Sequence, residues 1–177
     1  MIQKLAPLAV IFSFQTGLRR GETVALRYED IEGDELCVQR MYRFHDKTIV
    51  EFLKGHRDCR YVPLPKEAKR LIQTAKQYQQ ENGLPDTGYI FSVNDEPLSY
   101  YALGQLFNRY CDLIGTAPKS SHKARKTYIS TLVDAGVNIN TVREIVAHAS
   151  EKTTYNSYVF DRKPKDERLK LNDNALS

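Results

Sequence analysis

The spacing of apolar side chains along the sequence most limits the folds open to this chain. Residues 68–78 and 100–114 repeat apolar residues at intervals of three and four, which is the pattern of a helix with one buried face. Apolar content and capping residues predict further helices over five stretches: 3–16, a short segment after Arg19, 122–135, 138–146 and 153–160. The chain is therefore expected to be mostly helical.

One region interrupts the helical pattern. Residues 36–44, 48–53 and 60–64 are short runs rich in β-forming or alternating residues, with polar links between them. Such runs favour a small antiparallel sheet, so the expected fold is mixed, mostly α with a small three-stranded antiparallel β-sheet. No internal repeat or linker-like tract divides the sequence, and we expect a single domain over residues 1–177.

Basic residues are grouped in blocks. The chain has 26 Lys and Arg against 22 Asp and Glu, a net charge of +4. Residues 40–70 contain nine basic and four acidic side chains, and residues 119–126 contain four basic and none acidic. Basic blocks suit a polyanion such as nucleic acid, although a solvated basic surface gives the same pattern.

Several patterns are missing from the sequence. No apolar run approaches the roughly 18 residues of a membrane span, and no signal peptide is visible, so we expect a cytoplasmic protein without membrane contact. Cys37, Cys59 and Cys111 lack the spacing of a disulfide framework or a zinc site. There is no phosphate-binding loop of the ATPase type. The acidic residues within 30–35 share one turn before a strand, and we expect neither a metal nor a cofactor.

A histidine and an arginine form a candidate phosphate-binding pair. His122 and Arg125 are three residues apart, which places both side chains on one face of the expected helix. A guanidinium presents paired donors to phosphate oxygens, and an imidazole exchanges a proton near neutral pH. The same spacing occurs in many helices by chance, so the pair gains its meaning from other motifs.

Four motifs in a fixed order supply that context. They are T-G-L-R-R-G-E over residues 16–22, Lys54 followed by R-Y-V-P-L over residues 60–64, H-K-A-R over residues 122–125, and V-A-H over residues 146–148 followed by T-T and Tyr158. Their order and separations resemble those of the tyrosine recombinases, or phage integrase family, from about residue 14 to residue 160. The resemblance implies the catalytic-domain fold of that family, in agreement with the helical and strand patterns.

The resemblance implies a nucleophile and an acid. Tyr158 would attack the DNA backbone and form a 3′-phosphotyrosyl link, and Lys54 would protonate the leaving 5′-oxygen. A tyrosine with a pKa of about 10 needs a cationic pocket and a nearby base to react at neutral pH. Because the covalent link conserves the energy of the broken bond, the reaction would need neither ATP nor a metal.

The resemblance also implies which residues surround the phosphate. Arg19 and Arg125 would bind the oxygens of the scissile phosphate, where negative charge must be stabilised. His122 would assist proton transfer, and His148 would donate a hydrogen bond to the phosphate. Glu22 would support the position of the arginine without taking part in the chemistry.

Some assignments have neighbouring rivals. They are Arg20 for Arg19, Tyr155 for Tyr158, and Lys47 or Arg57 for Lys54. Tyr158 lies ten residues after His148, which fits the spacing in the family better than Tyr155 does. The sequence departs from the family at Ala147, where a glycine is usual, and the loss of backbone freedom there bears on the fit of His148.

The implied function is site-specific DNA recombination or integration on double-stranded DNA. The full-length protein would act as a homotetramer on two DNA sites, whereas this chain alone would be a monomer. The N-terminal core-binding domain of the family is absent from this chain, so we expect the fragment to bind DNA weakly. Two alternatives stay open at this point: DNA relaxation of the type IB topoisomerase kind, and a non-catalytic DNA-binding relative.

Overall fold

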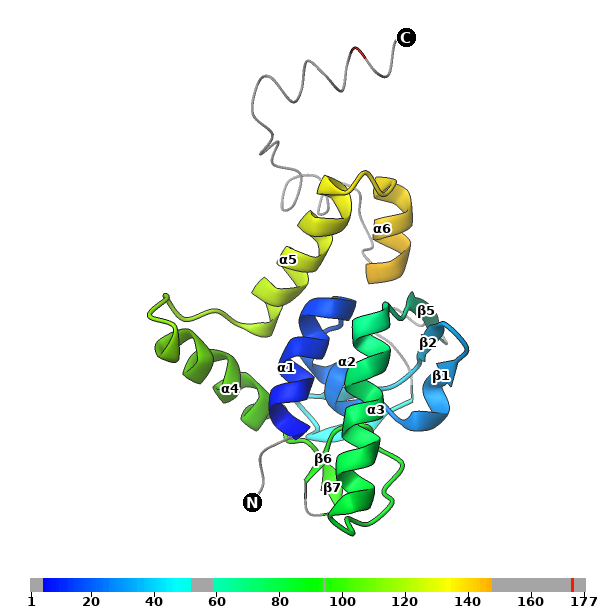
Figure 1. The fold of residues 1–177 in the computed structure, drawn as a ribbon, viewed down its shortest axis with the longest axis vertical. Helices are drawn as coiled ribbons and strands as arrows, with labels where there is room; N and C mark the ends of the chain where they lie inside the picture. The colour runs from blue at the N-terminus through cyan, green and yellow to red at the C-terminus, as the bar shows by residue number, and fades with distance from the viewer. Residues whose placement is uncertain (1–4, 52–58, 94, 148–172, 174–177) are drawn as a thin grey trace.

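Helices make up most of the structure, which is a computed structural model (Figure 1). It describes residues 5–51, 59–93, 95–147 and 173. The described helices are α1 (Leu5–Thr16), α2 (Arg20–Ala25), α3 (Lys66–Glu81), α4 (Tyr100–Leu113), α5 (Ser121–Asp134) and α6 (Ile139–Val146), with a short 3-10 helix, η1 (Tyr28–Asp30). The predicted helices within the described residues are therefore confirmed, whereas residues 153–160 lie outside them.

The strands form three small antiparallel sheets. The largest has the order β1-β2-β5, and the other two are the hairpins β3–β4 and β6–β7. The strand bounds are β1 (Ile31–Glu32), β2 (Glu35–Val38), β3 (Met41–Arg43), β4 (Thr48–Val50), β5 (Arg60–Pro63), β6 (Ser92–Val93) and β7 (Glu96–Pro97). The mostly helical fold with a small three-stranded antiparallel sheet is confirmed, but its strands are not all those that we predicted.

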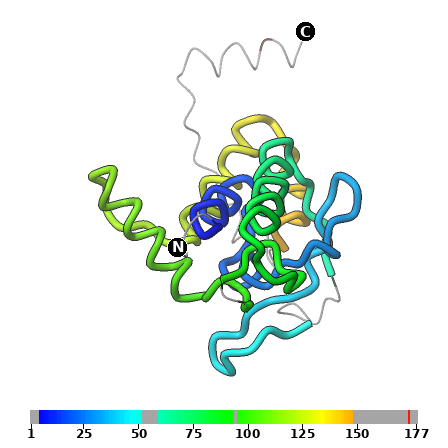
Figure 2. The backbone as a smooth tube through the Cα atoms, turned by 60° about the horizontal axis from the view of Figure 1, so that its bottom comes forward, coloured from blue at the N-terminus to red at the C-terminus, as the bar shows by residue number. Residues whose placement is uncertain are grey.

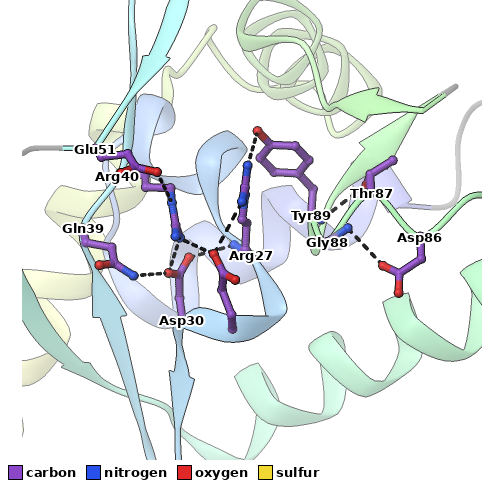
Figure 3. Close-up of polar contacts among 10 residues, drawn as sticks. Arg27, Asp30, Gln39, Arg40, Glu51, Asp86, Thr87, Gly88 and Tyr89 are labelled. Carbon is purple, nitrogen blue, oxygen red and sulfur yellow. Dashed lines mark hydrogen bonds and ion pairs between the residues drawn. The ribbon is translucent and has the colours of Figure 1, made fainter.

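The predicted strand over residues 36–44 is broken in the middle. Its first half, β2, pairs with β5, and its second half, β3, pairs with β4 in a separate hairpin. The break falls at Gln39 and Arg40, whose side chains both donate hydrogen bonds to the buried carboxylate of Asp30 (Figure 3). These bonds hold the chain beside η1, and the hairpin then leaves in a new direction at the edge of the molecule (Figure 2).

Helix α1 is the centre of the hydrophobic core. It lies beside α3, α4 and α5 (Figure 1), and its buried residues share one broad face of the helix. Phe12 is fully buried and meets Phe91 edge-on, with ring centroids 5.4 Å apart. A smaller cluster lies between α5 and α6, where Ile129 and Val142 are fully buried. The core thus joins α5 to α1 on one side and to α6 on the other.

Two helices begin where the sequence predicts, one with a side-chain cap and one without. Asn138 precedes α6, and its side-chain oxygen accepts a hydrogen bond of 2.8 Å from the backbone N–H of Asn140. Ser99 precedes α4, which begins at residue 100 as the apolar repeat predicts, but its side chain makes no capping bond. None of the described helices is both long enough and apolar enough to cross a membrane.

Gly17 offers a test of the close packing between α1 and α5. Its φ is +62°, and an added Cβ would lie 2.3 Å from Cδ1 of Tyr128. Gly33 has the same φ with open space around it. We expect Gly17→Ala to lower the free energy of unfolding by about 3 kcal/mol, from backbone strain plus overpacking, and Gly33→Ala by about 1 kcal/mol, from strain alone. Urea unfolding measures both, and equal losses would contradict this packing.

Candidate active site

Arg19 is held by a carboxylate one turn further along the chain. Helix α1 ends at Thr16, Gly17 turns the backbone, and Arg19 is extended immediately before α2. The backbone N–H of Arg19 donates to Oε2 of Glu22 at 2.8 Å, and Nη1 of Arg19 donates to Oε1 of Glu22 at 2.9 Å. One carboxylate therefore fixes both the backbone and the guanidinium of Arg19.

Glu22 is buried and charged at the same time. Its side chain is 1% exposed, and Nη1 and Nη2 of Arg60 donate to its two oxygens at 2.9 and 2.7 Å. Burial raises the pKa of Glu22, but the charges and hydrogen bonds of Arg60 and Arg19 outweigh it and hold that pKa at about 2. Glu22 is thus ionised at neutral pH, as a support for Arg19 requires.

Arg125 joins three parts of the fold. It lies on α5 and is buried. Its Nη1 donates to the carbonyl oxygen of Gly17 at 2.7 Å, and its Nη2 donates to the carbonyl oxygen of Val146 at the end of α6. The guanidinium is therefore fixed against the α1–α2 turn and against α6.

A cleft of about 400 Å³ brings the predicted residues together. Arg19, His122 and Arg125 all line it, although more than 100 residues separate Arg19 from the other two. The other lining residues are Leu18, Arg20, Gly21, Met41, Tyr42, Arg43, Phe44, Tyr100, Ser120 and Ser121. None of these described lining residues is acidic, so the cleft is positively charged and suits an anion such as a phosphodiester.

The imidazole of His122 is disposed to be neutral. Burial lowers its pKa, and the positive charges of Lys126, Arg125, Lys123 and Arg19 lower it further. A neutral imidazole can accept a proton at neutral pH, which an imidazolium cannot do. The side chain is therefore suited to the role of a base at the edge of the cleft.

The rival arginine, Arg20, lies at the same cleft in a different setting. Its guanidinium carbon is 3.6 Å from the ring centroid of Tyr100, and that ring stacks on Tyr42 with centroids 5.1 Å apart. Arg19 instead contacts Glu22 and the end of α6. The assignment of Arg19, rather than Arg20, to the phosphate stays a prediction. It is supported by the contacts of Arg19 with Glu22 and with the end of α6.

Three predicted site residues, Lys54, His148 and Tyr158, lie outside the described residues, as do the rivals Tyr155 and Arg57. The described range 95–147 ends at Ala147, one residue before His148. Ala147 has a φ of +48°, and its carbonyl oxygen accepts a hydrogen bond of 3.2 Å from Nη2 of Arg19. Ala147 thus adopts the left-handed backbone that the usual glycine of the family favours.

Other polar groups and cavities offer weaker candidates. In the described parts of the chain, no group of three or more His, Cys, Asp or Glu side chains could hold a metal ion. Within the acidic turn that we considered, Asp30 accepts hydrogen bonds from Gln39 and Arg40 (Figure 3). A larger cavity of about 600 Å³ lies between α1, β7 and α4, but neither Arg19 nor Arg125 lines it. The arginine cleft is therefore the candidate active site.

Comparison with known protein families shows to which family the chain belongs. The model of the Phage integrase family matches residues 4–164. The chain belongs to the phage integrase family. It is 28% identical over 170 residues to a tyrosine recombinase XerC-like protein of Caldanaerobacter subterraneus subsp. tengcongensis, covering 84% of this chain and 44% of that protein. It is 30% identical over 173 residues to the ICEBs1 integrase of Bacillus subtilis strain 168, covering 91% and 47%. The chain thus spans about half the length of these relatives.

Solved structures agree on the fold. The Tn1549 transposon integrase in complex with transposon right end DNA matches with a TM-score of 0.74 and 20% identity, over 96% of this chain and 58% of that one. XerA recombinase matches with a TM-score of 0.72 and 15% identity, over 97% and 64%. The expected family and its catalytic-domain fold are both confirmed.

The ionised carboxylate of Glu22 predicts a pH-dependent stability. Its pKa is about 2 in the folded chain against 4.5 for an ordinary glutamate, so its contribution is complete above pH 4.5 and is lost as the pH falls towards 2. We expect Glu22→Gln to lower the free energy of unfolding by about 3 kcal/mol at pH 6, and by about 1.5 kcal/mol at pH 3. Urea unfolding of the wild type and of Glu22→Gln between pH 3 and pH 6 checks this prediction. A difference in unfolding free energy that does not change with pH would contradict it.

Proposed function

We propose that this chain is the catalytic part of a site-specific DNA recombinase or integrase, which breaks and rejoins DNA strands through a covalent 3′-phosphotyrosyl intermediate. The observation that carries the proposal is the convergence of Arg19 and Arg125 on one cleft free of acidic lining residues. Family membership and the match to an integrase bound to DNA support it. The proposed partner is double-stranded DNA.

The two arginines supply positive charge where the reaction needs it. Attack on a phosphodiester places extra negative charge on the non-bridging oxygens, and fixed donors aimed at those oxygens stabilise the transition state. The contacts of Arg19 with Glu22 and of Arg125 with Gly17 fix the guanidiniums before DNA arrives. Guanidiniums held in this way can replace the metal ions that other phosphoryl-transfer enzymes use.

The covalent step balances with residues of this chain alone. In the proposed step the phenol oxygen of Tyr158 attacks phosphorus, its proton passes to a base such as His122, and the bond from phosphorus to the 5′-oxygen breaks. Lys54 protonates that oxygen, and His148 donates to the phosphate. A 5′-hydroxyl of a second strand then gives its proton to Lys54 and attacks phosphorus, the bond from phosphorus to Tyr158 breaks, and the phenol regains its proton from His122, so no high-energy cofactor is consumed.

The product of these steps depends on how many copies act together. We propose that four copies of the full-length protein assemble on two DNA sites, as in the recombinase family, and act in the cytoplasm. Each copy then supplies one nucleophile, and the strands exchange before they are resealed. The part of the full-length protein outside this chain would supply additional DNA contacts.

The experiment uses duplexes with a nick beside a randomised centre. Cleavage near the nick releases a short fragment that diffuses away, so the covalent adduct cannot reverse. We expect the wild-type chain to retain a defined set of duplexes after boiling in detergent, with excess EDTA and no nucleotide present. Sequencing of the retained DNA then yields the preferred site.

Other outcomes distinguish the alternatives. Relaxation of a supercoiled plasmid that lacks the selected site would indicate the topoisomerase alternative. Salt-sensitive DNA binding without any detergent-resistant adduct would indicate a non-catalytic relative. Arg19→Ala is the matched negative control, since it removes a cleft residue and keeps the nucleophile.

A further inference from the structure

We propose that Arg60, on β5, is a positioning residue of this active site. It fixes Arg19 and the end of α6 relative to each other. The scissile phosphate bound by Arg19 is thereby aligned with the segment that carries the nucleophile. The inference rests on the proposed function. Motif comparison placed Arg60 only as a marker beside Lys54, without a role of its own.

Arg60 is a buried arginine with three fixed contacts. Its side chain is 5% exposed, and its fork grips both oxygens of Glu22 at 2.9 and 2.7 Å. The remaining nitrogen, Nε, donates to the carbonyl oxygen of Ile145 at 3.0 Å. Because Glu22 also accepts from the backbone and the guanidinium of Arg19, Arg60 reaches Arg19 through a single carboxylate.

Three arginines grip three successive carbonyl groups at the end of α6. Arg60 donates to Ile145, Arg125 to Val146 and Arg19 to Ala147. The last carbonyls of a helix have no partner within the helix, so outside donors determine where the chain goes next. These donors come from β5, from α5 and from the turn before α2. The backbone from Ile145 to Ala147 is therefore fixed on three sides.

The three arginines have different roles in the proposed site. Arg19 and Arg125 line the cleft, and Arg60 is not among its lining residues. When a phosphate binds the guanidinium of Arg19, the hydrogen bonds of Arg60 to Glu22 and Ile145 still keep Glu22 and the end of α6 in place. Removal of Arg60 should therefore disturb the alignment of the reacting groups more than the affinity for DNA, since misplacement by about 1 Å can slow a reaction about 100-fold.

Lysine should replace Arg60 only in part. An ammonium is a compact point charge, and it cannot match a planar fork that spans two carboxylate oxygens and a carbonyl. Arg60→Lys keeps the charge that Glu22 needs and loses the geometry. Arg60→Met/Glu22→Gln removes both charges of the buried pair, which is far less destabilising than leaving one unpaired.

The test compares these two variants with wild type on the selected nicked duplex. With DNA at saturation, we expect the rate of adduct formation to fall about 10-fold in Arg60→Lys and about 100-fold in the double variant. The Kd for an un-nicked duplex should change less than about threefold, and thermal unfolding should show folded protein. Arg70→Lys is the matched control, because Arg70 forms an exposed fork with Glu67 on α3.

A structural role alone would give a different pattern. A saturating rate within about threefold of wild type in Arg60→Lys, or rates that only follow the folded fraction, would overturn the role of Arg60 while the proposed function stands. A slow double variant alone would not rescue that role, because Glu22→Gln by itself removes the carboxylate that holds Arg19. A wild-type chain that forms no adduct on any duplex would overturn the proposed function, and the inference with it.

Discussion

Tyr158→Phe is expected to abolish the covalent protein–DNA adduct. Phenylalanine keeps the ring and removes the only atom that we propose to attack phosphorus. Loss of an enzyme nucleophile costs at least about 10⁴-fold in the rate of the chemical step. The measurement is the time course of detergent-resistant adduct on the nicked duplex, with DNA affinity and thermal unfolding expected to match wild type.

Tyr155→Phe provides the matched control for that result. The two tyrosines are three residues apart in the same segment, and only Tyr158 lies ten residues after His148. We expect Tyr155→Phe to form adduct at a rate within about threefold of wild type, because it removes no group that acts in the proposed chemistry. Loss of adduct in Tyr155→Phe with retention in Tyr158→Phe would reverse the assignment and leave the family unchanged.

Arg125→Lys is expected to produce the second-largest loss. The substitution keeps one positive charge but removes the fork that contacts both Gly17 and Val146 beside the cleft. Removing one preorganised donor from a developing oxyanion costs about 10²- to 10³-fold in rate. We expect a loss of this size in the single-turnover rate of adduct formation at saturating DNA.

The comparison with Arg70→Lys separates this effect from a general loss of charge or fold. Arg70 carries the same guanidinium on an exposed face of α3, away from the cleft. Its replacement should leave the cleavage rate within about twofold, since exposed ion pairs contribute little. If Arg125→Lys also cleaved at the wild-type rate, Arg125 would not bind the scissile phosphate.

The longer helices were predictable because their buried faces recur over several turns. The stripe over residues 68–78 lies within α3, where Ala68, Leu71 and Ala75 are buried. The hairpin β6–β7 was missed, since each of its strands has two residues, too few to show an alternating pattern. The break between β2 and β3 was missed because it depends on Asp30, a residue that the local pattern does not include.

The site residues that belong to the sequence motifs were predictable. The contacts between residues far apart in the sequence were not. Arg60 and Val62 are two residues apart on β5 and share its buried face, so the strand pattern points a charged side chain inward. A buried arginine requires an acidic partner, so a signal for its role was present in the sequence. Nothing local identifies Glu22 as that partner, or Ile145 as the carbonyl that Arg60 also holds. Both contacts arise only when β5, α2 and α6 meet.

Mass spectrometry of the trapped adduct tests the proposed chemistry most directly. Trypsin should release residues 153–162 as one peptide that contains both Tyr155 and Tyr158, so fragmentation must locate the attached nucleotide. We predict a 3′-phosphonucleotide on the oxygen of Tyr158. A nucleotide joined through its 5′-phosphate, or carried by any residue other than Tyr158, would contradict the proposed mechanism.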